Sequence, residues 1–157
     1  LLRVNGVPVG REIGSDVVPL PGRSDDGEGS IIVIAATDAP LLPIQCKRLV
    51  QRATVGLART GGVGHNGSGD IFLAFSTGNH PTQDSIRAGD ANTGQPIGVQ
   101  MIPNHHINPL FEATAEAVEE SILNALSAAE TTTGYQGRTA HAIPLDQLQR
   151  VMECYRP

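Results

Sequence analysis

The chain changes character at Ser30. Residues 22–29 are small or charged and show no hydrophobic period, which predicts an exposed loop. The next segment, Ile31–Ala36, is an uninterrupted apolar run rich in β-branched residues. Such a run is typical of a strand covered on both faces. Ser30 is therefore predicted to lie where a polar loop meets a buried strand.

The Gly29–Ser30 peptide bond is chemically suited to self-cleavage. The Ser30 hydroxyl can add to the Gly29 carbonyl and move the acyl group from nitrogen to oxygen, after which water hydrolyses the ester. Gly29 has no side chain to crowd the tetrahedral intermediate. The released α-amine would have an unperturbed pKa of about 7.7–8.0, so it could act as the base for its own hydroxyl. Gly-Ser pairs are common, however, and a turn residue at the entry to a strand is the alternative interpretation.

A second polar segment, Gly61–Asp70, is rich in glycine and precedes the apolar run Ile71–Ser76. A phosphate-binding loop follows a strand and opens onto a helix, so the order here argues against nucleotide binding. Ser68 and Asp70 are two residues apart at the start of a predicted strand and should project to the same side. A hydroxyl and a carboxylate so placed could relay a hydrogen bond. The alternative is a glycine turn in which Asp70 caps backbone amides.

The remaining pattern predicts one domain that mixes strands with one-sided helices, an α+β arrangement of helix packed on sheet. Three helices are expected: one from Pro43 to about Arg59, one from Asn108 with Gly134 as its stop, and a short one from Leu145 to Tyr155. Residues 1–21 are expected to form an extended lead-in, residues 78–96 a loop, and residues 97–102 a third extended segment.

Composition excludes several classes of function. The net charge of −5 gives no basic field for nucleic acid. The sequence shows no apolar run of about 18 residues that could span a membrane, and residues 1–6 are not expected to be a signal peptide. Cys46 and Cys154 are expected to be reduced thiols rather than a disulfide framework. The chain starts at Leu1 without an initiator methionine, and we expect it to be a piece of a longer gene product.

The histidines give no metal signal. His105 and His106 are adjacent and would point in different directions on a regular element, so a metal site is not expected. His65 lies in the glycine-rich segment and could contact substrate, although a solvated loop histidine is the simpler interpretation. No cofactor is expected.

Five long strings of residues occur in a characteristic order: Gly6–Ile13, Ser30–Leu41, Gly56–Gly61, Asn66–Thr77 and Asn108–Thr114. Together they resemble the D-aminopeptidase/β-aminopeptidyl peptidase family, also called the L-aminopeptidase/D-esterase family. The resemblance covers nearly the whole chain.

The resemblance implies a precursor that cuts itself at a Gly–Ser bond, here Gly29–Ser30. Residues 1–29 would be the C-terminal tail of the α-subunit and residues 30–157 the β-subunit, which begins with the nucleophile Ser30. The family's supporting hydroxyl and carboxylate fall on Ser68 and Asp70, where many relatives carry Glu. The implied fold is a four-layer αββα sandwich resembling N-terminal nucleophile hydrolases with different connectivity.

The implied activity is an aminopeptidase, amidase or esterase that releases D-, L- or β-amino acids from short substrates with a free N-terminal amine. The oxyanion donors of such enzymes, an Asn and a Tyr, would lie mostly in the upstream α-subunit portion of the precursor. The implied assembly is a homo-oligomer, a tetramer of αβ units, in the cytoplasm or periplasm of a bacterium.

Two alternatives stay open at this stage. One is an acyltransferase similar to ornithine acetyltransferases, which cleave themselves before a threonine, so that serine at position 30 counts against it. The other is a catalytically silent, oligomer-forming domain of the same fold.

Overall fold

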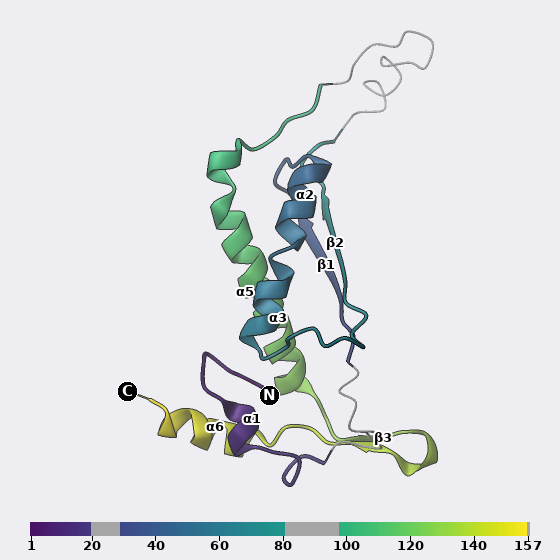
Figure 1. The fold of residues 1–157 in the computed structure, drawn as a ribbon, viewed down its shortest axis with the longest axis vertical. Helices are drawn as coiled ribbons and strands as arrows, with labels where there is room; N and C mark the ends of the chain where they lie inside the picture. The colour runs from purple at the N-terminus through teal and green to yellow at the C-terminus, as the bar shows by residue number, and fades with distance from the viewer. Residues whose placement is uncertain (20–28, 81–97, 157) are drawn as a thin grey trace.

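The computed structural model describes residues 1–19, 29–80 and 98–156. Its centre is a two-stranded parallel sheet formed by β1 (Ile32–Thr37) and β2 (Ile71–Ser76) (Figure 1). Ile32 lies opposite Ile71 and Thr37 lies opposite Ser76. The second strand has the predicted bounds, and the first begins and ends one residue later than predicted. Parallel pairing requires a crossover connection, which the helical segment between the strands provides.

The crossover contains two helices, α2 (Pro43–Val50) and α3 (Ala53–Arg59). The prediction of one continuous helix from Pro43 to Arg59 is therefore wrong. At the break, the Arg52 amide donates to the Leu49 carbonyl, three residues back. The Thr54 hydroxyl donates to the Gln51 carbonyl at 2.7 Å. These short-range hydrogen bonds replace the α-helical pattern and separate the two helices.

The longest helix, α5 (Asn108–Ala128), packs beside α2 and α3 (Figure 1). The apolar face of this helix is buried over its first half, at Phe111, Ala115 and Val118. Gly56 permits the close approach of α3, since a Cβ built there would lie 2.8 Å from the Val118 Cβ. The helix ends at Ala128, so the predicted stop at Gly134 is wrong.

Gly134 instead borders the turn of a small hairpin that sequence reasoning missed. Its antiparallel strands are β3 (Thr132–Thr133) and β4 (Thr139–Ala140), and η2 (Tyr135–Gly137) connects them. The predicted C-terminal helix is present as α6 (Leu145–Cys154).

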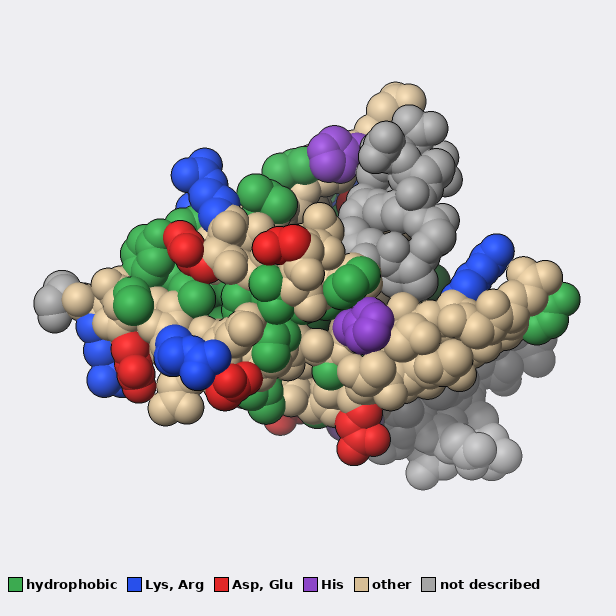
Figure 2. All heavy atoms as spheres, turned by 90° about the horizontal axis from the view of Figure 1, so that it is seen from below, with side chains coloured by type: hydrophobic (Ala, Val, Ile, Leu, Met, Phe, Trp, Pro, Cys, Tyr) green, Lys and Arg blue, Asp and Glu red, His purple; other side chains and the backbone are tan. Residues whose placement is uncertain are grey.

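The lead-in is not wholly extended, because it contains the short helix α1 (Val9–Glu12) with Val9 fully buried. Helices α1 and α6 lie side by side (Figure 1), and the Tyr155 hydroxyl donates to Glu12 Oε1 at 2.9 Å. Figure 2 views the lower end of the molecule and shows acidic and basic side chains interspersed among apolar ones, without a continuous basic surface.

The segment after the second strand is irregular where it is described. Residues 98–103 form no strand, so the extended segment predicted over 97–102 adds no strand to the sheet within the described residues. The 3₁₀ turn η1 (Asn104–His106) follows and leads into α5. Residues 78–80 are irregular, as predicted. The loop predictions for residues 22–28 and 81–96, and the first residue of the segment 97–102, lie outside the described residues. No helix in the described ranges has the length and apolarity needed to cross a bilayer.

The helices cover one face of the sheet. Leu41, Cys46, Leu49, Ile107 and Phe111 form the core cluster between helices and sheet. Gln45 is also buried, and its Nε2 donates to the Ile102 carbonyl at 2.7 Å.

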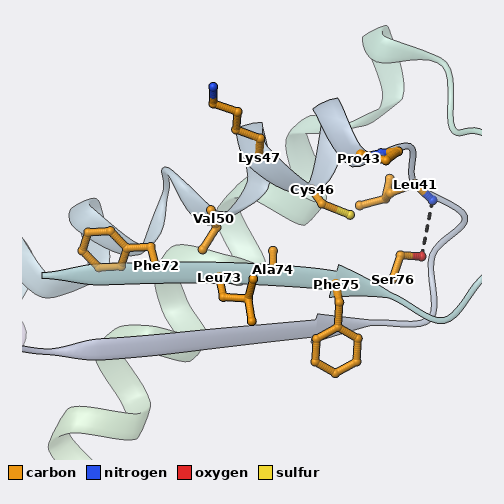
Figure 3. A pocket seen from close by; sticks show the side chains of 10 residues that line it. All are labelled: Leu41, Pro43, Cys46, Lys47, Val50, Phe72, Leu73, Ala74, Phe75 and Ser76. Atoms are coloured by element: carbon orange, nitrogen blue, oxygen red, sulfur yellow. Dashed lines mark hydrogen bonds between the residues drawn. The ribbon is translucent and has the colours of Figure 1, made fainter.

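The opposite face of the sheet is apolar and uncovered by any described part of the chain. We call it the open face; it consists of Ile32, Ile34, Ile71, Leu73 and Phe75, which are 45–69% exposed. Figure 3 shows Leu73 and Phe75 pointing away from α2, whereas Ala74 points toward it. The prediction that the first strand is covered on both faces is therefore not met by the described residues. The mixture of helices and strands agrees with the predicted α+β class, and among the described residues the β1–β2 sheet has helices on one side.

Candidate active site

The three predicted catalytic residues meet at one edge of the sheet. Ser30 precedes β1, while Ser68 and Asp70 precede β2. Because the strands are parallel and in register, their amino ends lie side by side, and the Ile71 amide donates to the Ile31 carbonyl at 2.9 Å. This pairing brings two segments together that are about 40 residues apart in the sequence.

Two short contacts connect these segments, and a third lies within the glycine-rich turn. Ser68 Oγ lies 2.7 Å from the carbonyl oxygen of Gly29 and 2.5 Å from Asp70 Oδ1. The backbone amide of Gly69 donates to Ser30 Oγ at 3.0 Å. The hydroxyl and the carbonyl of the predicted scissile pair are thus both held by residues of the glycine-rich turn. The catalytic roles of Ser30, Ser68 and Asp70 stay predictions, but their proximity is observed.

The neighbourhood of Asp70 favours a relay over a turn cap. Within the described residues its hydrogen-bond partner is the Ser68 hydroxyl rather than a backbone amide. Both side chains are half-buried, whereas Gly29 and Ser30 are exposed. A partly buried hydroxyl–carboxylate pair beside an exposed serine can orient a proton acceptor or a leaving group.

Glycines make this close approach sterically feasible. A Cβ at Gly69 would lie 3.2 Å from Ser30 Oγ, closer than most such contacts. Gly64 has a φ of +60°, which favours glycine, and a Cβ there would lie 3.6 Å from Asp70 Oδ2. The Ser68 amide donates to the His65 carbonyl at 2.8 Å and closes the turn. Backbone, not side chain, therefore shapes this part of the site.

A pocket of about 380 Å³ opens beside these groups. Its polar wall contains Gly29, Ser30, Ser68 and Asp70, and its apolar wall includes Leu57, Val63 and Ile122. The volume lies in the range of small-ligand sites. Sequence reasoning missed that Leu57 and Ile122 line the pocket. The available signal was only that both are apolar residues within predicted helices. His65 also lines the pocket and is exposed.

A second pocket, of about 450 Å³, lies between α2 and β2 (Figure 3). Cys46 and Lys47 are among its lining residues, and the Leu41 amide donates to Ser76 Oγ at 3.5 Å at one end. Burial raises the pKa of the Cys46 thiol, so the thiol stays protonated near neutral pH and is a poor nucleophile. This pocket carries no comparable set of reactive groups.

Metal ligands do not cluster in the part of the chain that the structure describes: no three His, Cys, Asp or Glu side chains are placed to hold an ion. His105 and His106 lie against each other, with ring centroids 4.2 Å apart and the rings tilted by 50°.

Comparison with known proteins identifies close relatives. A sequence model of peptidase family S58 matches residues 1–140. The β-peptidyl aminopeptidase BapA of Sphingosinicella microcystinivorans is 42% identical over 165 aligned residues, which cover 99% of this chain and 40% of that relative. This chain therefore spans about 40% of the relative's length.

Two solved structures are similar over nearly the whole chain. A β-aminopeptidase from a Burkholderia species has 45% sequence identity and a TM-score of 0.80, over 99% of this chain and 41% of its own. The L-aminopeptidase D-Ala-esterase/amidase of Ochrobactrum anthropi has 36% identity and a TM-score of 0.77, over 98% and 39%.

The Ochrobactrum anthropi enzyme is described as a prototype for the serine aminopeptidases and as a new variant of the Ntn hydrolase fold. The family resemblance read from the sequence is thereby confirmed, and with it an α+β fold similar to that variant. The family match over residues 1–140 and the identities of 36–45% along almost all of the sequence agree: the chain belongs to peptidase family S58.

Proposed function

We propose that the protein containing this chain is a self-processing aminopeptidase whose nucleophile is Ser30. The observation that supports this most directly is the cluster at the amino ends of β1 and β2. There Ser68 Oγ lies within hydrogen-bond distance of both the Gly29 carbonyl and Asp70, and the neighbouring Gly69 amide donates to Ser30 Oγ. The names of the three relatives reported above add support, since each denotes an aminopeptidase.

In turnover, Ser30 Oγ attacks the carbonyl carbon of the substrate. The Ser30 α-amine, freed by cleavage at Gly29, takes the hydroxyl proton and passes it to the leaving amine. Ser68 and Asp70 orient this network. Water then hydrolyses the acyl-enzyme and restores the hydroxyl. One residue supplies both nucleophile and base, because an α-amine ionises near neutral pH.

The proposed substrates are short peptides, amides or esters with a free N-terminal amine. Relatives named β-peptidyl aminopeptidase and L-aminopeptidase D-Ala-esterase/amidase make β-, D- and L-configured residues reasonable candidates. The apolar wall formed by Leu57, Val63 and Ile122 suits a small aliphatic side chain next to the scissile bond.

The rest of the precursor is proposed to cover the open face. An exposed, wholly apolar sheet face is unusual on a soluble surface and marks a site of association. A second sheet packed there would give the four-layer αββα sandwich and would bring the missing oxyanion donors to the site. We further propose that the complete αβ units assemble as a homo-oligomer, with a tetramer as the expected state. A catalytically silent domain or an acyltransferase is not favoured, because the relatives found are peptidases.

The test is denaturing mass spectrometry of the full-length protein, compared with a Ser30→Ala variant. Two fragments divided between Gly29 and Ser30, together with hydrolysis of an aminoacyl p-nitroanilide panel that includes D- and β-residues, are expected for the wild type. The Ser30→Ala protein should stay intact and inactive. Ser127→Ala is a matched control, because this exposed hydroxyl donates only to its own helix, at the Leu123 carbonyl. An active Ser30→Ala protein would reject the proposal.

A further inference from the structure

His65 lies in the wall of the pocket that also contains Ser30, although no step of the reaction described above uses its side chain. The His65 carbonyl accepts a hydrogen bond from the Ser68 amide at 2.8 Å. The preceding residue, Gly64, lies against Asp70, since a Cβ built there would be 3.6 Å from Asp70 Oδ2. The backbone of His65 is therefore fixed by the same turn that holds Ser68 and Asp70.

The pocket differs between its inner end and its mouth. Leu57 of α3 and Ile122 of α5 are half-buried and form the inner apolar wall. Val63 is 73% exposed and His65 is also exposed, so these two residues border the mouth. An imidazole at the mouth meets whatever part of a substrate extends from the pocket toward solvent.

The direction of the substrate follows from the proposed activity. An aminopeptidase releases the first residue of a peptide, and the part that follows the scissile bond has no fixed length. That part must therefore leave through the mouth, while the first residue occupies the inner end against Leu57 and Ile122. In a dipeptide, the single residue after the scissile bond ends in a carboxylate. This places the carboxylate on the side of the pocket where His65 lies.

The charges of the pocket favour the same direction. Asp70 is half-buried, and its carboxylate disfavours a second carboxylate beside it. Among the described residues that line the pocket, His65 is the only one whose side chain can carry a positive charge. Neutral or protonated, an imidazole donates at least one N–H, and its hydrogen bond to a carboxylate is charge-assisted. An acid within the pocket and a donor at its mouth complement the two charged ends of a dipeptide.

We propose that His65 is a specificity-determining residue that binds the C-terminal carboxylate of a dipeptide at the mouth of the pocket. This role rests on the aminopeptidase function proposed above. It narrows the preferred peptide substrates to those with a carboxylate one residue after the scissile bond. His65 takes no part in making or breaking bonds, so its contribution is to substrate binding.

The test uses the full-length, self-cleaved protein and matched pairs of substrates. The probes are L-Ala-L-Ala, D-Ala-L-Ala and β-Ala-L-Ala, each compared with its C-terminal amide, which lacks only the terminal negative charge. His65→Ala is expected to lower kcat/KM for the acid form of the accepted dipeptide at least about tenfold, because a hydrogen bond to a charged group contributes about that factor or more. The value for the amide should change less than about threefold.

The loss should appear in KM with kcat nearly unchanged, because the contact is made equally in the ground state and the transition state. His105→Ala is the matched control, since His105 is an exposed histidine that does not line the pocket. It should leave both substrate forms unaffected. His65→Glu gives an independent measurement: its carboxylate repels that of the dipeptide, so the acid form should lose more than in His65→Ala while the amide is retained.

Self-cleavage between Gly29 and Ser30 reports that each variant is folded, because the scissile pair has no described hydrogen bond to the imidazole. Equal losses for acid and amide, or an unchanged preference in both His65 variants, would overturn this role while leaving the aminopeptidase function intact. A wild-type protein that neither cuts itself nor hydrolyses any probe would instead remove the proposed function.

Discussion

Ile32 lies directly opposite Ile71 in the parallel β1–β2 pair, and this register sets the separation of Ser30 from Asp70. Both isoleucines belong to the open face, so a slip of one residue would turn the open-face residues of one strand toward the helices and its helix-facing residues outward. The site therefore depends on packing several residues away from it. Its geometry is a consequence of strand register and of a turn whose glycines admit close backbone contacts.

The first prediction concerns Gly69. Replacing it with alanine places a methyl group 3.2 Å from Ser30 Oγ, which must move the hydroxyl or the turn. Self-cleavage of the full-length Gly69→Ala precursor is expected to slow at least about tenfold, because small misplacements of reacting groups cost about that much or more. Mass spectrometry over time measures it.

The control for this change is Gly98→Ala, where a Cβ meets nothing within 4 Å. Its cleavage should match that of the wild type. If both alanine variants cleave normally, contact between the turn and Ser30 has no part in positioning the nucleophile.

The second prediction concerns the packing of α3 on α5. A methyl group at Gly56 would lie 2.8 Å from the Val118 Cβ and would meet the Ala115 carbonyl as well. Overpacking of this kind costs about 1–3 kcal/mol. Urea denaturation should show Gly56→Ala less stable by that amount, and an unchanged midpoint would mean that the two helices can separate freely.

The third prediction tests the open face. Leu73→Lys places a charge on a surface that is proposed to be buried by the rest of the precursor, at a cost of several kcal/mol for an unpaired buried charge. The full-length variant should be insoluble or melt well below the wild type. Val99→Lys is the matched control, because Val99 is similarly exposed, at 59% against 54%, and lies outside the open face. Equal melting temperatures for the two variants would mean that the open face is not covered.

Much of the site could be predicted from the sequence because its residues sit at transitions that composition makes visible. The change from a polar loop to β-branched residues marks Ser30, and the glycines before Ile71 mark Ser68 and Asp70. The contacts themselves could not be predicted, because they depend on the register of two strands that are far apart in the chain.

Other features left no usable signal. The break between α2 and α3 falls at Gln51 and Arg52. Both residue types have a high helix propensity, so the sequence does not indicate that the helix is interrupted there. The short helix α1 is stabilised by burial of Val9 and not by local propensity. The sequence predicts that the first strand is covered on both faces, because an apolar run indicates burial. The run does not identify the chain segment that covers the open face.

The last prediction concerns the two thiols. Burial raises the pKa of Cys46 above its ordinary value of 9.0, so its reactive thiolate is scarcer in the folded protein than in the unfolded chain. Folding therefore favours the protonated thiol of Cys46. Its contribution to the free energy of unfolding is present below the pKa of the unfolded chain and is lost as the pH rises through the higher pKa of the folded protein.

Cys154 is exposed and free. Iodoacetamide at pH 8 should therefore label Cys154 at least about tenfold faster than Cys46, because reactivity follows the thiolate fraction and access. Peptide mapping after timed labelling measures both rates, and labelling in urea, where the two should converge, is the control. Comparable rates under native conditions would mean that the core around Leu49 and Phe111 opens readily to solvent, contrary to the burial of these side chains.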